Sequence, residues 1–244
     1  MGSRPFAEFQ TCVQGYLHLT ELGDAPGALT PALITEYLTE AAVEHSRYRP
    51  RKVTDATLDG TGSLTEFRLD TLTAPFEEEF SDLTAVEYPT GSTPPAFLEK
   101  DTDWSLARNS SGQPVVRFAS APVNGTNNIR LEYVARHTLT AASNTVLDAD
   151  FYAVCHLAAA AGLLSMAGRA AHRVQPSITV DDGGPRTQSD VYRAVAKEHR
   201  AQYFAHFGIS EKDAGQVGAA SGTRDWDSVF SHGAPWLTHH WRTR

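Results

Sequence analysis

The stretch that decides the fold is DADFYAVCHLAAAAGLLSMAGRAAH, residues 148–172. Asp148 and Asp150 suit the positive N-terminal end of a helix, where a negative charge is stabilising. The residues that follow are mostly apolar, and many of them are small, from Ala158 to Gly162 and from Ala167 to Ala171. The stretch therefore predicts a helix that a neighbour can approach closely. That neighbour could belong to the same subunit or to another one, and composition does not choose between them.

A second and a third helix are predicted on either side of this one in the sequence. Thr30 is a good N-cap, a proline suits the first helical position, and apolar residues then repeat every three or four positions. This pattern predicts a helix over Pro31–Tyr48 that ends before Pro50. Further along, Thr187 with Asp190 resembles a capping box, and the helical pattern runs to a glycine stop at residue 208.

Between the first two predicted helices the pattern changes to short strands. Apolar and polar residues alternate in stretches rich in Thr, Val, Tyr and Phe, and turn-forming segments such as DGTG and VNGTNN separate them. The stretches are SLTEFRLDTL (63–72), DLTAVEYP (82–89), PVVRFAS (114–120) and NIRLEYVAR (128–136). Strands this short, with turns this frequent, predict a small antiparallel sheet or sandwich.

The predicted fold class is α+β, with a three-helix body, a small antiparallel β module inserted between the first and second helices, and an extended C-terminal tail. Residues 30–51 and 138–210 form the helical body, and residues 52–137 form the inserted β module. Residues 1–29 are an N-terminal arm, expected to be irregular because glycine and proline interrupt it. Residues 211–244 are a linker and an aromatic tail.

The tail is unusual because three of the four tryptophans lie in the last nineteen residues. The segment before them, EKDAGQVGAASG (211–222), has too little apolar surface to pack and is expected to act as a mobile tether. Large aromatic residues beyond a tether are typical anchors for a hydrophobic groove on a partner. The predicted partner-binding residues are Trp226, Phe230, Trp236, Leu237 and Trp241. One alternative stays open, in which the tail folds back and completes the core of its own domain.

Composition excludes several classes of partner. A net charge of -8 and a pI near 5.6 argue against nucleic acid or a membrane surface, and the one basic run, Arg47–Lys52, suits a solvated helix end. No stretch is expected to supply the ~20 apolar residues of a membrane span, and the first residues do not resemble a signal peptide. Cytoplasmic synthesis is therefore expected, with Cys12 and Cys155 as reduced core thiols.

No motif for catalysis is present in the sequence, whether a nucleophile elbow, a phosphate-binding loop or a metal-binding HExxH or CxxC. Asp181 and Asp182 in DDGGP could form a carboxylate pair or hold a cation, but a loop between helices uses the same residues. The run Glu77–Glu79 could coordinate Ca²⁺, but a solvated connection explains it more simply. The ten histidines lack metal-ligand spacing. The protein is predicted not to be an enzyme, with no catalytic, cofactor-binding or metal-binding residues.

The order of these segments is similar to that of a known protein family. The phrases VEYPTGSTPPAFLEKDTDW (86–104), IRLEYVARHTL (129–139) and VYRAVAKEHRAQYFAHFG (191–208), placed around the 148–172 helix, resemble the head-tail connector (adaptor) proteins of long-tailed bacteriophages. The resemblance covers roughly residues 29–207 and is one of architecture and loose phrasing. The connector family also has smaller, all-helical members that lack an N-terminal arm and a β insertion.

The resemblance implies a structural virion protein that forms a homo-oligomeric ring, usually a dodecamer, in the neck. Such a ring docks on the portal, joins the capsid to the next neck or tail component, and lets genome DNA pass without specific binding. It implies no cofactor and no membrane partner. The location implied is the virion neck, with the host cytoplasm during assembly. The tail would reach the portal or a neighbouring subunit.

Two alternatives remain at this point. The chain could be a small hydrolase or a carbohydrate-binding protein with an unrecognised site, in which Trp104, Tyr88 and Tyr133 of the β module would offer an aromatic platform. It could also be another neck or tail protein, such as a tail terminator, which would lack the helical body.

Overall fold

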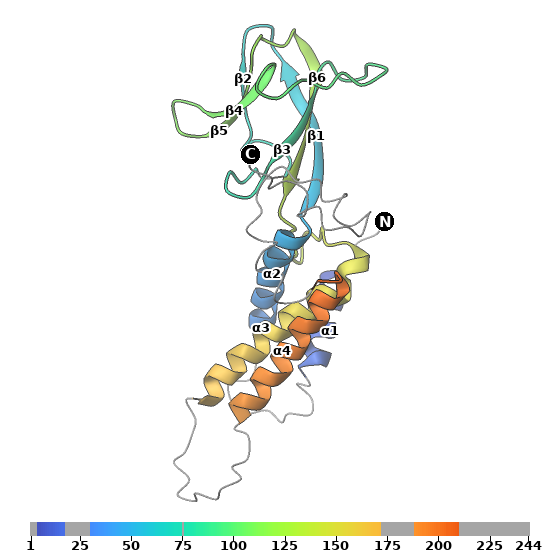
Figure 1. Ribbon diagram of the computed structural model, residues 1–244, viewed down its shortest axis with the longest axis vertical. Coiled ribbons are helices and arrows are strands. Elements are labelled where there is room, and N and C mark those ends of the chain that lie inside the picture. The colour runs from blue at the N-terminus through green and yellow to red at the C-terminus, as the bar shows by residue number, and fades with distance from the viewer. Residues whose placement is uncertain (1–3, 18–29, 75, 172–187, 210–244) are drawn as a thin grey trace, which may run out of the picture.

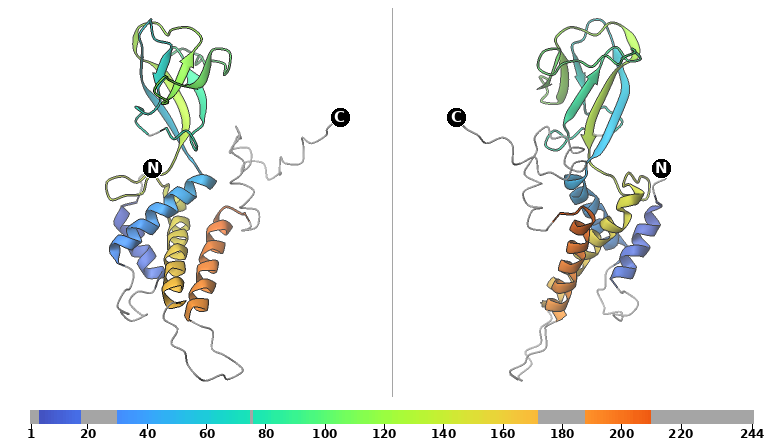
Figure 2. Two further views of the ribbon diagram at one scale, coloured as in Figure 1. Left: turned by 90° about the vertical axis from the view of Figure 1, so that its left-hand side faces the viewer. Right: turned by 45° about the vertical axis from the view of Figure 1, so that its right-hand side comes forward.

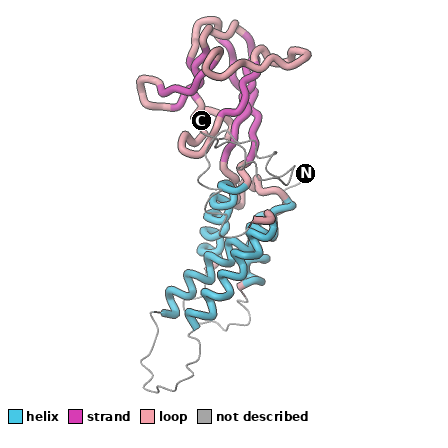
Figure 3. The backbone as a smooth tube through the Cα atoms, viewed as in Figure 1, coloured by secondary structure: helices cyan, strands magenta, loops and turns pink. Residues whose placement is uncertain are grey.

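The computed structural model describes residues 4–17, 30–74, 76–171 and 188–209. Helices gather at one end of the molecule and strands at the other, so that the described chain is elongated (Figures 1 and 3). The prediction of the α+β class is confirmed.

The first predicted helix has the predicted bounds. Helix α2 spans Pro31–Tyr48, and the Thr30 hydroxyl accepts a hydrogen bond from the Leu33 backbone N–H at 3.3 Å. That bond satisfies one of the backbone donors that a helix leaves free at its start. One face of α2 is buried in the helical core through residues such as Ile34 and Leu38.

The stretch 148–172 forms the central helix of the body. A short 3-10 turn, η1 (Asp148–Asp150), leads into α3 (Phe151–Ala171), and helices α1, α2 and α4 all pack against α3. Ala158 and Ala159 are completely buried. The small residues of α3 therefore let its neighbours within the subunit approach closely.

The third predicted helix is α4 (Gln188–His206). Its start lies against α3, where the Ser189 hydroxyl donates to the Ala167 carbonyl at 3.0 Å. Just beyond its end, Gly208 has a φ of +65°, a left-handed conformation that glycine adopts without strain. The predicted glycine stop is confirmed.

The prediction of an irregular N-terminal arm over residues 1–29 is wrong for residues 6–16, which form helix α1 (Phe6–Tyr16). Phe9 and Val13 are buried, and the Phe9 ring meets the Phe151 ring edge-on at 4.6 Å between centroids. Phe6, Phe9 and Val13 repeat at three and four positions, which is the spacing of a helix face. The described body thus has four helices where the sequence predicted three.

The helix Asp148–Ala171 corrects a second expectation. With a mean hydropathy of 1.5 over its most apolar window, it is long and apolar enough to cross a membrane by length and composition. In the structure 61% of that window is buried among the other helices. The helix is this apolar because it contains many alanines, which its close packing against the other helices requires.

The β module consists of two three-stranded antiparallel sheets. The first has the order β1 (Arg51–Gly60), β6 (Gly125–Ala135), β3 (Leu83–Glu87). The second has the order β2 (Glu66–Arg68), β5 (Pro114–Phe118), β4 (Trp104–Arg108). The four predicted stretches contain β2, β3 and β5 and all but the first residues of β6. Strand β6 begins at Gly125, inside the segment VNGTNN that was expected to be a turn, and β1 and β4 were not predicted.

The module has its own hydrophobic core, separate from that of the helices. Side chains from both sheets meet in it, among them Leu131 and Val116, both fully buried. Strands β1 and β6 pair along most of their length, starting with Arg51 opposite Ala135 at the helical end. They form the stalk by which the module projects from the helices (Figure 2).

Candidate functional site at the base of the β module

The predicted partner-binding residues lie outside the described residues. They are Trp226, Phe230, Trp236, Leu237 and Trp241. Within the described part, buried polar side chains and a cleft gather where the helices meet the β module. The chain passes this place twice, between α2 and β1 and again between β6 and η1.

Asp150 is the centre of a buried ion cluster. Its carboxylate is fully buried and lies 2.7 Å from the Arg49 guanidinium, 3.0 Å from His206 Nε2 and 3.6 Å from His45 Nε2. His45 is also fully buried, and its Nδ1 is 3.2 Å from the Tyr203 hydroxyl. These residues join the ends of α2 and α4 to the start of α3.

His137 connects the returning strand to the same place. Its backbone N–H donates to the Ser46 hydroxyl oxygen at 2.8 Å. Its ring nitrogens lie 2.9 Å from the Thr145 carbonyl and 3.0 Å from the Arg49 carbonyl. The Ser46 hydroxyl in turn donates to the Ala42 carbonyl at 2.7 Å. The base of the module is therefore bonded to α2 through both side chain and backbone.

Electrostatics at the junction favour a charged carboxylate. Burial of Asp150 alone would raise its pKa, but the nearby His45, a hydrogen bond from His206 and the charge of Arg49 outweigh burial and lower the pKa to about 2. The pKa of His137 is lowered, first because the ring is buried and then because His45 lies beside it. The two imidazole rings are 5.2 Å apart between centroids.

These shifts predict how stability depends on pH. Below the ordinary histidine pKa of 6.5 His137 takes up a proton in the unfolded chain, whereas in the folded chain its lowered pKa keeps the ring neutral to a lower pH. The free energy of unfolding should therefore fall as the pH drops from 7.5 to 5. Urea unfolding at the two pH values measures this. A His137→Gln variant should show a smaller fall, and an unchanged fall would contradict the prediction. The stability that Asp150 contributes is present above pH 4 and is lost as the pH approaches 2.

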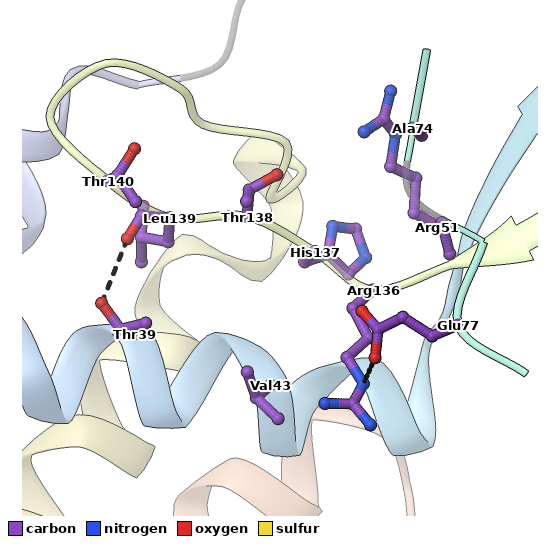
Figure 4. Close-up of a pocket in the computed structure, with 11 residues that line it drawn as sticks. Thr39, Val43, Arg51, Ala74, Glu77, Arg136, His137, Thr138, Leu139 and Thr140 are labelled. Carbon is purple, nitrogen blue, oxygen red and sulfur yellow. Dashed lines mark hydrogen bonds and ion pairs between the residues drawn. The ribbon is translucent and has the colours of Figure 1, made fainter. Parts of the chain in front are cut away.

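A cleft of about 190 Å³ lies beside this cluster, between α2 and the base of the module. Figure 4 shows Val43 of α2 on one side and Leu139 of the returning segment on the other. The Thr39 hydroxyl reaches the Leu139 carbonyl at 3.5 Å. Arg51 and Arg136 line the cleft with their cationic side chains, and Glu77 pairs with Arg136 at 2.9 Å. Its walls thus combine apolar contact surface with positive charge.

The arrangement at the junction is suited to holding parts together. The Ser46 hydroxyl is engaged on both sides, and burial raises the pKa of the Tyr203 phenol, so neither group is prepared as a nucleophile or a base. Among the described residues, no three or more His, Cys, Asp and Glu side chains are arranged so that they could hold a metal ion. We conclude that the cluster holds the ends of α2 and α4 to the start of α3, and that His137 joins the returning strand to the end of α2.

The other acidic residues considered as cation ligands do not form one site in the described part of the chain. Glu77 pairs with Arg136, whereas Glu78 pairs with Arg108 at 2.8 Å, so these carboxylates do not converge on one ion. Asp181 and Asp182 lie outside the described residues.

The aromatic platform proposed for a carbohydrate is not formed by the three residues considered. Trp104 is 2% exposed and donates from its indole N–H to the Leu98 carbonyl at 3.2 Å. Tyr133 is 1% exposed, and its hydroxyl donates to the Ala74 carbonyl. Tyr88 accepts a hydrogen bond from the Val123 backbone N–H at 2.6 Å. All three rings support the module from inside.

A second polar contact lies within the helical body. His156 Nδ1 and His199 Nδ1 are 2.8 Å apart, and Tyr16 stacks on His156 at 4.4 Å between centroids. Burial, followed by the charge of His199, lowers the pKa of His156. Cys12 and Cys155 belong to the same α1–α3 contact, and hydrogen bonding to Cys155 lowers the pKa of Cys12 to about 7. His156 is therefore a half-buried imidazole at the edge of the helical core.

Sequence reasoning did not find the junction residues. Asp150 was expected only to suit a helix start, and His45 and His206 were assigned no role. Arg49 was expected to belong to a solvated helix end, but it pairs with the buried Asp150. A signal was available, because an acidic helix start and two basic helix ends are complementary. Spacing along the chain could not show that these three helix ends meet.

Comparisons with known proteins complete the description. No protein-family model and no curated protein matches the sequence. Among solved structures, a chain from "Neck of empty GTA particle computed with C6 symmetry" is 17% identical over 78% of this chain and 88% of its own, with a TM-score of 0.27.

Two further chains are similar at the same level. A chain from "Virion of native gene transfer agent (GTA) particle" is 17% identical over 78% of this chain and 89% of its own, with a TM-score of 0.28. A chain from "Neck of native GTA particle computed with C12 symmetry" is 14% identical over 79% and 92%, with a TM-score of 0.26. Scores of this size do not establish a shared arrangement of the elements.

Proposed function

We propose that this chain is a structural protein of the neck of a virus-like particle, and that its copies form a ring that joins capsid to tail. The observation that carries the proposal is that the subunit consists of two structurally distinct parts. A compact group of helices forms one end, and a β module with its own core projects from the other. Together with the resemblance to head-tail connectors, this division favours an assembly protein.

The surface of the helices offers contacts for ring formation. Leu164 on α3 is 45% exposed, and Val191 on α4 is also 45% exposed. Large apolar side chains exposed on packed helices are suitable centres of subunit interfaces. In the proposed ring the helices contact their neighbours, and a dodecamer is the expected order.

The partners proposed for the ring follow the same resemblance. The ring would dock on a portal and receive the next neck component, and genome DNA would pass through it without specific binding. In the assembled particle the tail would supply the anchors Trp226, Phe230, Trp236, Leu237 and Trp241 to the portal or to a neighbouring subunit. We propose that the chain acts without catalysis.

Native mass spectrometry of the purified full chain tests ring formation. We expect a closed oligomer, and we expect Leu164→Asp combined with Val191→Asp to shift it to monomers, since each exposed aspartate would have to be buried in the interface. Leu64→Asp is the matched control, because Leu64 is 54% exposed in the β module. A monomeric wild-type chain at micromolar concentration, with or without portal present, would count against the ring.

A further inference from the structure

We infer that the junction cleft is the docking site for Trp226 of the chain's own tail, in the same subunit, before any partner binds. The junction cleft is the 190 Å³ space lined by Val43, Arg51, Ala135, Arg136 and Leu139, among others. The inference concerns the free subunit, so it does not depend on the proposed ring.

The size and lining of the cleft suit an indole ring. A cavity of about 150 Å³ is large enough for a benzene ring, so 190 Å³ leaves room for a larger aromatic side chain. Val43, Ala135 and Leu139 supply apolar walls, and Arg51 supplies a guanidinium group that can lie over an aromatic face. The Arg136 guanidinium already lies over the Phe80 ring and pairs with Glu77. Aromatic side chains in such a pocket dominate binding energies.

Charge selects Trp226 among the tail tryptophans. The segment Arg224–Asp227 around Trp226 carries two aspartates and one arginine, whereas Trp236 follows a proline and Trp241 precedes Arg242 and Arg244. The Arg51 guanidinium has no ion pair with any residue that the structure describes, and it lines the cleft. One of the two aspartates can pair with it when the indole is in the cleft. The basic neighbour of Trp241 would instead meet the like charge of Arg51, since Glu77 already pairs with Arg136.

The connection is long enough and begins close by. Sixteen residues separate Ile209 from Trp226. A chain of that length and Gly/Ala-rich composition spans roughly 20–24 Å. The end of α4 already lies at the junction, because the Phe207 ring is 5.8 Å from the His45 ring and His45 is 5.2 Å from His137, which lines the cleft. A short tether gives the cleft a millimolar effective concentration of its own tail, which favours docking within one subunit.

Fluorine NMR of the full chain labelled with 5-fluorotryptophan tests this inference. The four tryptophan resonances are assigned by single Trp→Phe substitutions. We expect the Trp226 resonance to be shifted from its unfolded position and protected from solvent, independent of protein concentration. Val43→Phe, which fills the cleft, and Arg51→Glu should each return it to the unfolded position. Asp225→Lys combined with Arg51→Glu should restore the shift.

Arg47→Glu is the matched control, because it makes the same charge change on the exposed end of α2 and should leave the Trp226 resonance in place. Three results would overturn the inference. The first is a wild-type Trp226 resonance at its unfolded position. The second is an equal response to Arg47→Glu and Arg51→Glu. The third is a shift that appears only at high protein concentration, which would assign the cleft to the tail of a second copy.

Discussion

Asp150→Ala is expected to lower the free energy of unfolding by about 3–5 kcal/mol. The substitution leaves the buried His45 and the partly buried Arg49 without their carboxylate, and a buried charge that loses its partner is costly. Urea unfolding at pH 7, followed by circular dichroism, measures the change. Asp150→Asn, which keeps the size and part of the hydrogen bonding, should be milder.

The matched control is Asp148→Ala, two residues before Asp150. Asp148 belongs to the same turn and pairs with Arg4, but its side chain is 52% exposed and that of Arg4 is 35% exposed. Surface ion pairs are worth about 0–1 kcal/mol, so Asp148→Ala should be nearly neutral. Equal effects of the two substitutions would show that the buried cluster does not stabilise the junction.

Truncation after Gly233 is expected to abolish stable attachment of the proposed ring to its portal or head partner. The truncated chain keeps Trp226 and Phe230 but loses Trp236, Leu237 and Trp241. Each buried aromatic anchor at an interface can be worth ~2 kcal/mol or more, so the loss of two tryptophans should weaken binding by roughly a thousand-fold. Co-sedimentation of purified rings with partner particles measures the attachment.

The single variants Trp236→Ala and Trp241→Ala should show graded forms of the same defect, and Thr238→Ala between them is the control. The unfolding free energy of the truncated subunit should stay within about 0.5 kcal/mol of the full chain, as expected for changes away from a core. If the truncated subunit is much less stable, Trp236 and Trp241 complete the core of their own domain, and the anchor proposal fails.

Together, the predictions separate three roles for three regions. Asp150 holds three helix ends together at the base of the β module. In the proposed ring the exposed residues Leu164 and Val191 make subunit contacts, and the last tryptophans attach the ring. The cleft adds a fourth role, since it would hold the first tail tryptophan until assembly. Each role has its own measurement, so one can fail without the others.

Local patterns in the sequence were enough for most elements. Helix α2 could be bounded to the residue because Thr30, Pro31 and Pro50 act on their immediate neighbours. The glycine stop after α4 and the strands β3, β5 and β6 are likewise local consequences of φ preference and period-two alternation. The signal for helix α1 is equally local, since Phe6, Phe9 and Val13 repeat at helical spacing, but the glycines and proline of residues 1–29 predicted an irregular arm.

The junction was decided only by the tertiary structure. Asp150, Arg49 and His206 are ordinary helix-terminal residues until the packing of α2, α3 and α4 brings three helix ends together. Packing of the two sheets against each other buries Trp104 and Tyr133. The contact between α2 and the returning strand creates the cleft. Burial changes what a charged or aromatic side chain does, because a low-dielectric environment strengthens its interactions and removes it from solvent. Sequence spacing determines which side chains share a face of one element, whereas contact between elements depends on their packing.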